Sequence, residues 1–110
     1  MIDNKFLDEE RFARSYTRGK FRIKQWGKVK ITSQLKAKQV SDYCIRKAMT
    51  EIDEEDYFTS LNQVLTKEHQ RLSLRIKNQY ELKQKLYAKG VRQGYESYLI
   101  SEVLSDILSN

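Results

Sequence analysis

The sequence has no proline, only four glycines and a single cysteine in 110 residues. Helices would therefore meet few residues that interrupt them. One cysteine excludes an internal disulfide, and no apolar run is long enough to span a bilayer or to act as a signal peptide, which favours a cytoplasmic protein. Charged residues make up 33% of the chain. We predict an all-α protein, too short for a typical enzyme with a deep cleft.

Residues that could carry catalysis or bind a metal are scarce. The only histidine, His69, and the only cysteine, Cys44, fall on separate predicted helices. We interpret His69 as solvated and Cys44 as semi-buried. Acidic clusters at 8–10 and 53–56 could bind a divalent cation, but their place at predicted helix starts already explains them. We expect no metal, no cofactor, no catalytic residue and no enzymatic activity.

Capping signals and helical spacing predict three helices in the first half. Asp8 is typical of an N-cap, and Leu7 and Phe12 have the spacing of a hydrophobic staple around it. The pair Trp26-Gly27 interrupts the apolar spacing before a second helix. Ser41 is typical of the N-cap of a third helix.

This pattern recurs in the second half. Residues 52–57 reproduce 7–12, residues 86–91 match 35–40, and 99–104 resemble the helix after Ser41. The offset grows from 45 to 51 to 55 residues, so we expect longer connections in the second copy, around 68–77 and 92–96. The repeat predicts two tandem, helix-turn-helix-like units of three helices, at residues 1–51 and 52–110.

Each unit should bury its own apolar core. In the first unit we expect the core to contain Phe12, Tyr16, Trp26, Ile31, Leu35, Val40, Ile45 and Met49. In the second we expect Tyr57, Leu61, Tyr80, Leu82, Leu86, Val91, Ile100 and Leu104.

The charge is unevenly distributed. The net charge is +6, and between Arg11 and Ser41 there are ten basic residues and no acidic one. Such a field favours a polyanionic or acidic partner. Arg14, Arg18 and Arg22 step by four along the first helix, and we expect their counter-charge to come from outside the chain. The candidate binding residues are Arg14, Arg18, Lys20, Arg22, Lys24, Lys28, Lys30, Lys36 and Lys38.

The stretch from Leu7 to Tyr16, LDEERFARSY, resembles the opening motif of the RecX family of recombinase regulators. The resemblance continues through Trp26-Gly27, Ile31, Leu35, the turn at 38–40, Ile45 and Ala48, with Gln39 where glycine is usual. It recurs weakly as Leu86, residues 89–91, Ile100 and Leu104. It spans nearly the whole chain.

That family usually has three such repeats, and this chain resembles the second and third. Residues 2–6 resemble the end of a preceding repeat, so we expect the first repeat to be missing. The resemblance implies a protein that binds the RecA filament on DNA, including single-stranded DNA through the filament, and we expect it to be a monomer. It also implies that strand exchange, ATP hydrolysis and co-protease activity are dampened without chemistry of the regulator's own.

Two other functions are compatible with the residues. A helical nucleic-acid-binding module without a recombinase partner would use the same basic face on phosphates. A scaffold whose charge only confers solubility would have no salt-sensitive partner. A membrane partner is not expected.

Overall fold

The computed structural model describes residues 2–109, with side chains from Asp8 onward. This part of the chain is all-α, as predicted, with no strand in it. The helices are α1 (Ile2–Lys24), α2 (Lys28–Ala37), α3 (Asp42–Met49), α4 (Glu54–Ser73), α5 (Gln79–Gln93) and α6 (Ser97–Leu108). None of them is long and apolar enough to cross a membrane.

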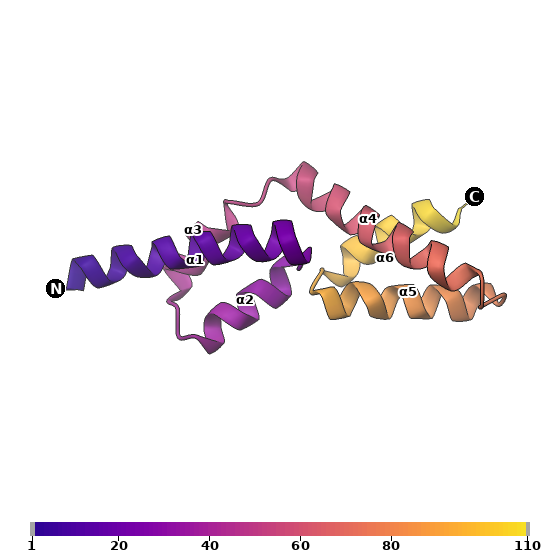
Figure 1. Cartoon of the computed structure of the whole chain (residues 1–110), viewed down its shortest axis with the longest axis horizontal. Coiled ribbons are helices and arrows are strands. Elements are labelled where there is room, and N and C mark those ends of the chain that lie inside the picture. The colour runs from indigo at the N-terminus through magenta and orange to yellow at the C-terminus, as the bar shows by residue number, and fades with distance from the viewer. Residues whose placement is uncertain (1, 110) are drawn as a thin grey trace.

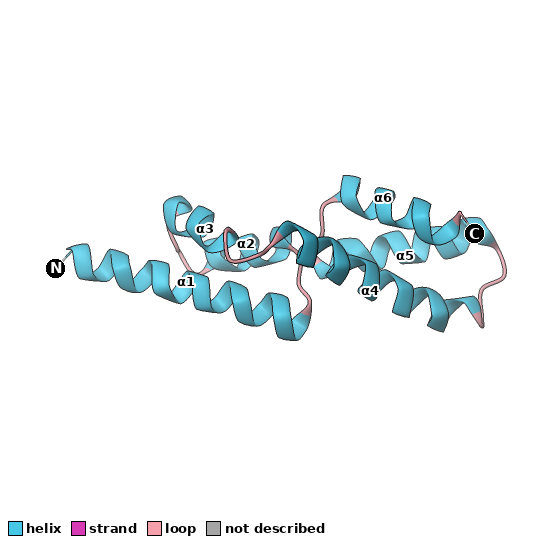
Figure 2. Cartoon of the chain, turned by 90° about the horizontal axis from the view of Figure 1, so that it is seen from above, coloured by secondary structure: helices cyan, strands magenta, loops and turns pink. Residues whose placement is uncertain are grey.

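The helices form two groups of three placed end to end. Helices α1, α2 and α3 pack on one another, and α4, α5 and α6 do the same. Figure 1 shows one group following the other along the long axis, and Figure 2 shows the same arrangement from above. The body measures 59 × 24 × 21 Å. The proposed division after residue 51 falls in the connection between α3 and α4.

The predicted start of the first helix at Asp8 is wrong. Helix α1 begins at Ile2, and Asp8 lies inside it. No proline or glycine stands before Asp8 to stop the helix from extending backward. The predicted Leu7–Phe12 staple and the resemblance of residues 2–6 to a repeat end depend on side chains outside the described ones.

Two other predicted N-caps are confirmed. The Ser41 hydroxyl accepts a hydrogen bond from the Cys44 amide at 3.3 Å. The Asp53 carboxylate accepts from the amides of Glu55 and Asp56, each at 3.1 Å. Both residues have extended backbone and satisfy first-turn amides that have no partner within their helix.

The match of residues 86–91 to 35–40 does not extend to a turn, because α5 continues through residues 89–91 to Gln93. Gly90 is buried inside the helix, where an added Cβ would lie 2.8 Å from the Ile100 side chain. The left-handed residue that ends α5 is Gly94, with φ of +97°. The predicted longer connections are only partly right: residues 68–73 extend α4, and just 74–78 connect it to α5.

Phe12 is not a core residue: its side chain is 45% exposed. Helix α1 instead buries Ala13, Thr17 and Phe21, which step by four. Phe12 and Tyr16 lie on the flank of that stripe. Ala13 and Thr17 are small enough to let α3 approach α1 closely, which a phenylalanine in the stripe would prevent.

Most of the remaining predicted core is confirmed. The following are buried: Ile31, Leu35, Val40, Ile45, Tyr57, Leu61, Leu82, Leu86, Ile100 and Leu104. Tyr16, Trp26 and Met49 are partly buried and pack against this core. Tyr80 and Val91 were predicted to be buried but are exposed. They lie on the outer face of α5, whose inner face is formed by Leu82, Leu86 and Gly90.

The two groups of helices are joined where the α1–α2 turn meets the α5–α6 turn. The Gly27 amide donates to the Gln93 carbonyl at 2.7 Å, and the Val29 amide donates to the Gly94 carbonyl at 2.9 Å. In return, the Gln93 side-chain amide donates to the carbonyls of Lys24 and Gln25. Each turn therefore satisfies backbone groups that the other leaves open.

Two buried tyrosines reinforce this junction. The Tyr57 hydroxyl accepts from the Lys28 amide at 2.8 Å and donates to the Glu96 carboxylate at 2.6 Å. The Tyr95 hydroxyl donates to the Gln25 carbonyl at 3.0 Å. The two rings lie 5.0 Å apart. Burial raises the pKa of Tyr95 to about 12, so its hydroxyl keeps its proton at neutral pH.

We predict that Gly27→Ala is strongly destabilising. An added Cβ would lie 2.2 Å from the Gly94 carbonyl oxygen, so the two turns would have to separate. Overpacking of this kind typically costs about 3 kcal/mol. Urea unfolding measures this loss of folding free energy. The matched control is Gly19→Ala on α1, where nothing lies within 4 Å of the added Cβ. That change should stabilise by about 0.5–1 kcal/mol. Equal urea midpoints for the two variants would contradict the close contact.

We predict that Gln39→Gly stabilises the protein by about 1 kcal/mol, because Gln39 has the left-handed conformation that disfavours a side chain. Its φ is +64° at the end of α2. The control is Gln34→Gly, an exposed position inside α2, which should destabilise by about 1 kcal/mol. Thermal melts of both variants give the sign of each effect. A loss of stability in both would show that the backbone at Gln39 carries no strain.

Candidate functional site

The nine predicted binding residues all lie on α1, the α1–α2 turn and α2, but they do not form one uniform face. They divide into arginines paired inside the chain, lysines placed over aromatic rings, and exposed basic side chains. Sequence spacing alone gives no indication of this division.

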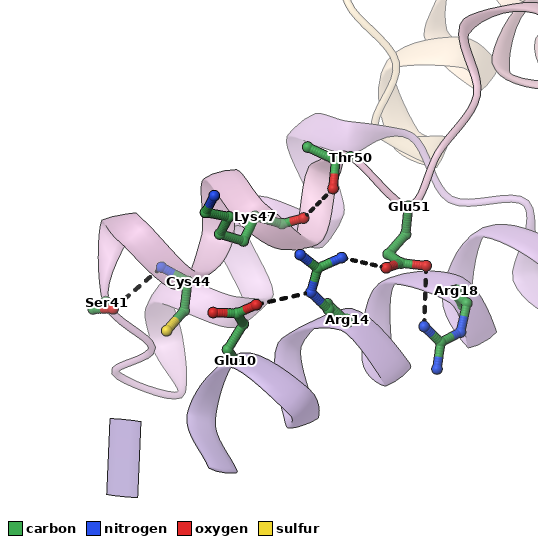
Figure 3. A network of polar contacts seen from close by, with 8 residues as sticks. All are labelled: Glu10, Arg14, Arg18, Ser41, Cys44, Lys47, Thr50 and Glu51. Carbon is green, nitrogen blue, oxygen red and sulfur yellow. Dashed lines mark hydrogen bonds and ion pairs between the residues drawn. The ribbon is translucent and has the colours of Figure 1, made fainter. Parts of the chain in front are cut away.

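Arg14 and Arg18 are held by acids from the chain itself. The Arg14 guanidinium pairs with Glu10 at 3.0 Å and closely with Glu51, which follows α3. Arg18 pairs with the same Glu51 at 3.0 Å. Figure 3 shows the Glu51 carboxylate between the two guanidinium groups, with Glu10 on the other side of Arg14. The expectation that these arginines are counter-charged from outside is therefore wrong.

This pairing alters the acid–base behaviour of Glu51. Hydrogen bonds from Arg18 and Arg14 hold the pKa of its carboxyl below the ordinary value of 4.5. The same contacts raise the pKa of Arg14. Because Glu51 follows α3 and the arginines lie on α1, the network ties the end of α3 to α1. These two arginines therefore contribute to the packing of the first unit.

Three lysines gather around two aromatic rings. The Lys20 ammonium lies 4.9 Å from the Trp26 ring centre and 5.5 Å from that of Tyr16. Lys30 approaches Trp26 at 4.5 Å, and Lys38 approaches Tyr16 at 5.7 Å. No ion pair involves these lysines among the described residues. Their charge is therefore available to an anionic partner.

The rest of the basic set borders this cluster. Lys28 places its ammonium 4.7 Å from the Tyr57 ring centre. Lys28 and Lys36 also line an open hollow of about 540 Å³ between α2 and the start of α6. Arg22 and Lys24 are exposed on the last turn of α1. Helix α2 has no acidic residue, so no acid on the same helix offsets the charge of Lys28, Lys30 and Lys36.

Sequence reasoning missed the aromatic part of this surface, because it assigned the rings to the core. Phe12, Tyr16 and Lys20 step by four, which places them on one flank of α1. Trp26 joins them from the turn, where its amide donates to the Lys20 carbonyl at 3.2 Å. The alternation of aromatic and basic residues at this spacing is the signal that could have revealed the flank.

The described part of the chain has no cluster of metal-binding side chains. It contains no group of three or more His, Cys, Asp or Glu side chains placed to bind a metal ion. Cys44 is buried, and burial raises the pKa of its thiol, which reduces the thiolate fraction. The candidate functional site is the set of basic side chains on α1, the α1–α2 turn and α2 that have no ion pair within the described residues, and we call it the basic surface: Lys20, Arg22, Lys24, Lys28, Lys30, Lys36 and Lys38.

Comparison with known proteins relates this chain to one family of regulatory proteins. Residues 8–49 match the family model described as RecX, second three-helix domain. The Regulatory protein RecX of Prosthecochloris aestuarii (strain DSM 271 / SK 413) is 29% identical over 104 residues. That match covers 94% of this chain but only 65% of the relative, so the chain spans less than two thirds of that protein's length. No solved structure matches significantly.

We predict that Glu51→Gln lowers the melting temperature at neutral pH, and that the difference from the wild type shrinks as the solution is acidified. A depressed pKa means that ionised Glu51 stabilises the folded state above its ordinary value of 4.5. That stability is lost as the pH falls through the lowered folded value. Thermal melts between pH 7 and pH 3 measure the trend.

The control is Glu102→Gln, which removes an exposed carboxylate of α6. It should leave the pH dependence close to that of the wild type. A Glu51→Gln deficit of the same size at every pH would show that the loss comes from packing, and that the ion pairs with Arg14 and Arg18 contribute nothing.

Proposed function

The chain belongs to the RecX family, and from this premise we propose that it is a regulatory protein that binds the RecA recombinase filament on DNA. In this proposal it modulates, and mainly inhibits, strand exchange, ATP hydrolysis and co-protease activity. It acts by occupying the filament in the cytoplasm and performs no chemistry of its own.

The observation that carries the proposal is the basic surface of the first unit. Helix α2 has three lysines and Lys38 follows directly as its C-cap, and none of the four is in an ion pair within the described residues. A surface of this kind attracts DNA phosphates or an acidic protein surface, and both are available on a nucleoprotein filament. The segment matched by the family model, residues 8–49, contains this surface.

The joined turns support the same proposal. Because the backbone bonds of Gly27 and Val29 link the two groups of helices, the basic surface is part of an elongated body 59 Å long and reaches the junction between the groups. A body of this shape can lie along a filament and contact more than one subunit. The inhibitory effect then follows from holding neighbouring subunits in one arrangement.

We predict that the double variant Lys36→Glu/Lys38→Glu loses filament binding by about tenfold or more. Both side chains are exposed, so the fold should be retained. Co-sedimentation with preassembled RecA filaments on single-stranded DNA measures binding, and ATP hydrolysis by RecA measures inhibition. If both lysines contact phosphates, the salt dependence should flatten by about 1.4 units, from about 0.7 per contact on single strands.

The matched control is Lys83→Glu/Lys85→Glu on α5, which makes the same change in net charge at two exposed positions of the second unit. It should bind and inhibit like the wild type. Equal losses of filament binding in the two double variants would show that net charge alone accounts for the binding. Bare DNA that competes fully with the filament would favour the alternative, a nucleic-acid-binding module without a recombinase partner.

A further inference from the structure

A row of aromatic side chains lies beside the lysines of the first unit. The ring centres of Phe12 and Tyr16 are 5.7 Å apart, and those of Tyr16 and Trp26 are 6.5 Å apart. Phe12 is 45% exposed, whereas Tyr16 and Trp26 are partly buried against the core. The row therefore runs from the Trp26 ring, anchored at the α1–α2 turn, to the exposed Phe12 ring. We call these three rings the aromatic row.

Core packing does not account for the whole row. The stripe that α1 buries is Ala13, Thr17 and Phe21, and Phe12 lies off it. A large apolar side chain left exposed loses the gain that burial would bring, about 1.5–3 kcal/mol for a phenylalanine. Exposed rings next to a strongly charged surface are a common feature of binding sites.

The lysines around the aromatic row are held weakly. Lys20, Lys30 and Lys38 contact the row only through ring faces, at 4.5–5.7 Å from the ring centres. A contact between a cation and a ring contributes about 0.5–1 kcal/mol where it is exposed and about 2 kcal/mol or more where it is desolvated. Lys38 is exposed and Lys20 and Lys30 are only partly buried, so none of the three contacts is fully desolvated. A phosphate can therefore draw these ammonium groups away and leave ring faces open.

We propose that the aromatic row and its three lysines form a stacking site for unpaired bases of a nucleic-acid strand. The bases would stack on the rings while Lys20, Lys30 and Lys38 pair with the phosphates between them. The inference rests on the proposed function, because it names the part of the filament that this basic surface recognises: exposed single strand.

Charge and ring geometry together favour this ligand. Proteins that bind single strands without sequence preference combine a basic surface with aromatic side chains on which successive bases stack. Duplex DNA offers its phosphates to the lysines, but its base faces are covered by neighbouring base pairs. An acidic protein surface would likewise use the lysines without needing the exposed Phe12 ring.

The single tryptophan makes the proposal directly measurable, since Trp26 is the only one in the chain. Oligothymidylate is titrated into the full chain at low salt while tryptophan emission is followed. Stacking at the row should quench the emission. A strand of the same length whose sugars carry no bases should bind about tenfold more weakly and leave the emission nearly unchanged.

Two variants test the aromatic row at an exposed ring, where the substitution does not disturb the core. Phe12→Leu removes an exposed ring and should weaken oligothymidylate binding by about tenfold. Its control is Tyr80→Leu, which removes a ring that is 73% exposed on α5 and should leave binding unchanged. Circular dichroism checks that both variants keep the helices.

Equal binding and equal quenching by the base-free strand would overturn the inference, because the surface would then recognise charge alone. Wild-type affinity in Phe12→Leu would also overturn it. Filament co-sedimentation separates these results from the proposed function. A chain that binds filaments without base-dependent quenching contradicts only the stacking site. If oligothymidylate quenches the tryptophan emission but the protein does not co-sediment with filaments, only the proposed recombinase partner is contradicted.

Discussion

The contact between the α1–α2 turn and the α5–α6 turn is the constraint on which the rest of the structure depends. Gly27 lacks a side chain that could cap α2, and the first amides of that helix are satisfied from the other unit, by the Gly94 carbonyl and the Tyr57 hydroxyl. Both turns need glycine at the contact, because a Cβ on Gly94 would lie 2.2 Å from that of Lys30. Three-helix units of this size have small cores, and each stabilises the other here.

The junction also decides what the protein can present to a partner. Trp26 is the residue before Gly27, so its ring is positioned by the same turn that bonds to the second unit. Lys28 and Lys30 follow directly and begin α2 with a fixed orientation. The junction thus fixes the backbone that carries the basic surface, which in the proposed function reduces the ordering cost of binding. On that proposal, a loosened junction would weaken binding without any change in the basic residues.

The sequence predicted the fold wherever a local signal has one structural meaning. Ser41 and Asp53 cap their helices as expected, because a short polar side chain before an apolar run can satisfy first-turn amides. The same signal failed at Asp8, where no residue before it ends the helix. Gly90 and Gly94 both fit a helix end. The structure shows that Gly94 ends the helix, whereas Gly90 lies inside it and leaves room for the Ile100 side chain. This contact between α5 and α6 cannot be recognised from the local sequence. Phe12 was misplaced because hydrophobicity ranks it above Ala13 and Thr17, whereas close helix packing favours the smaller residues.

The basic run looks uniform in the sequence, yet the structure separates arginine from lysine. A guanidinium has a planar array of donors, so Arg14 can bond Glu10 and Glu51 together and fix the end of α3. An ammonium group is compact and sits on a flexible stem, so Lys20, Lys30 and Lys38 rest on ring faces that they can leave. Spacing along a helix cannot show this difference, because Glu51 is 37 residues from Arg14. The chemistry of the two side chains does show it: the guanidinium bonds with fixed geometry and ties α3 to α1, whereas the movable ammonium groups have no ion pair among the described residues.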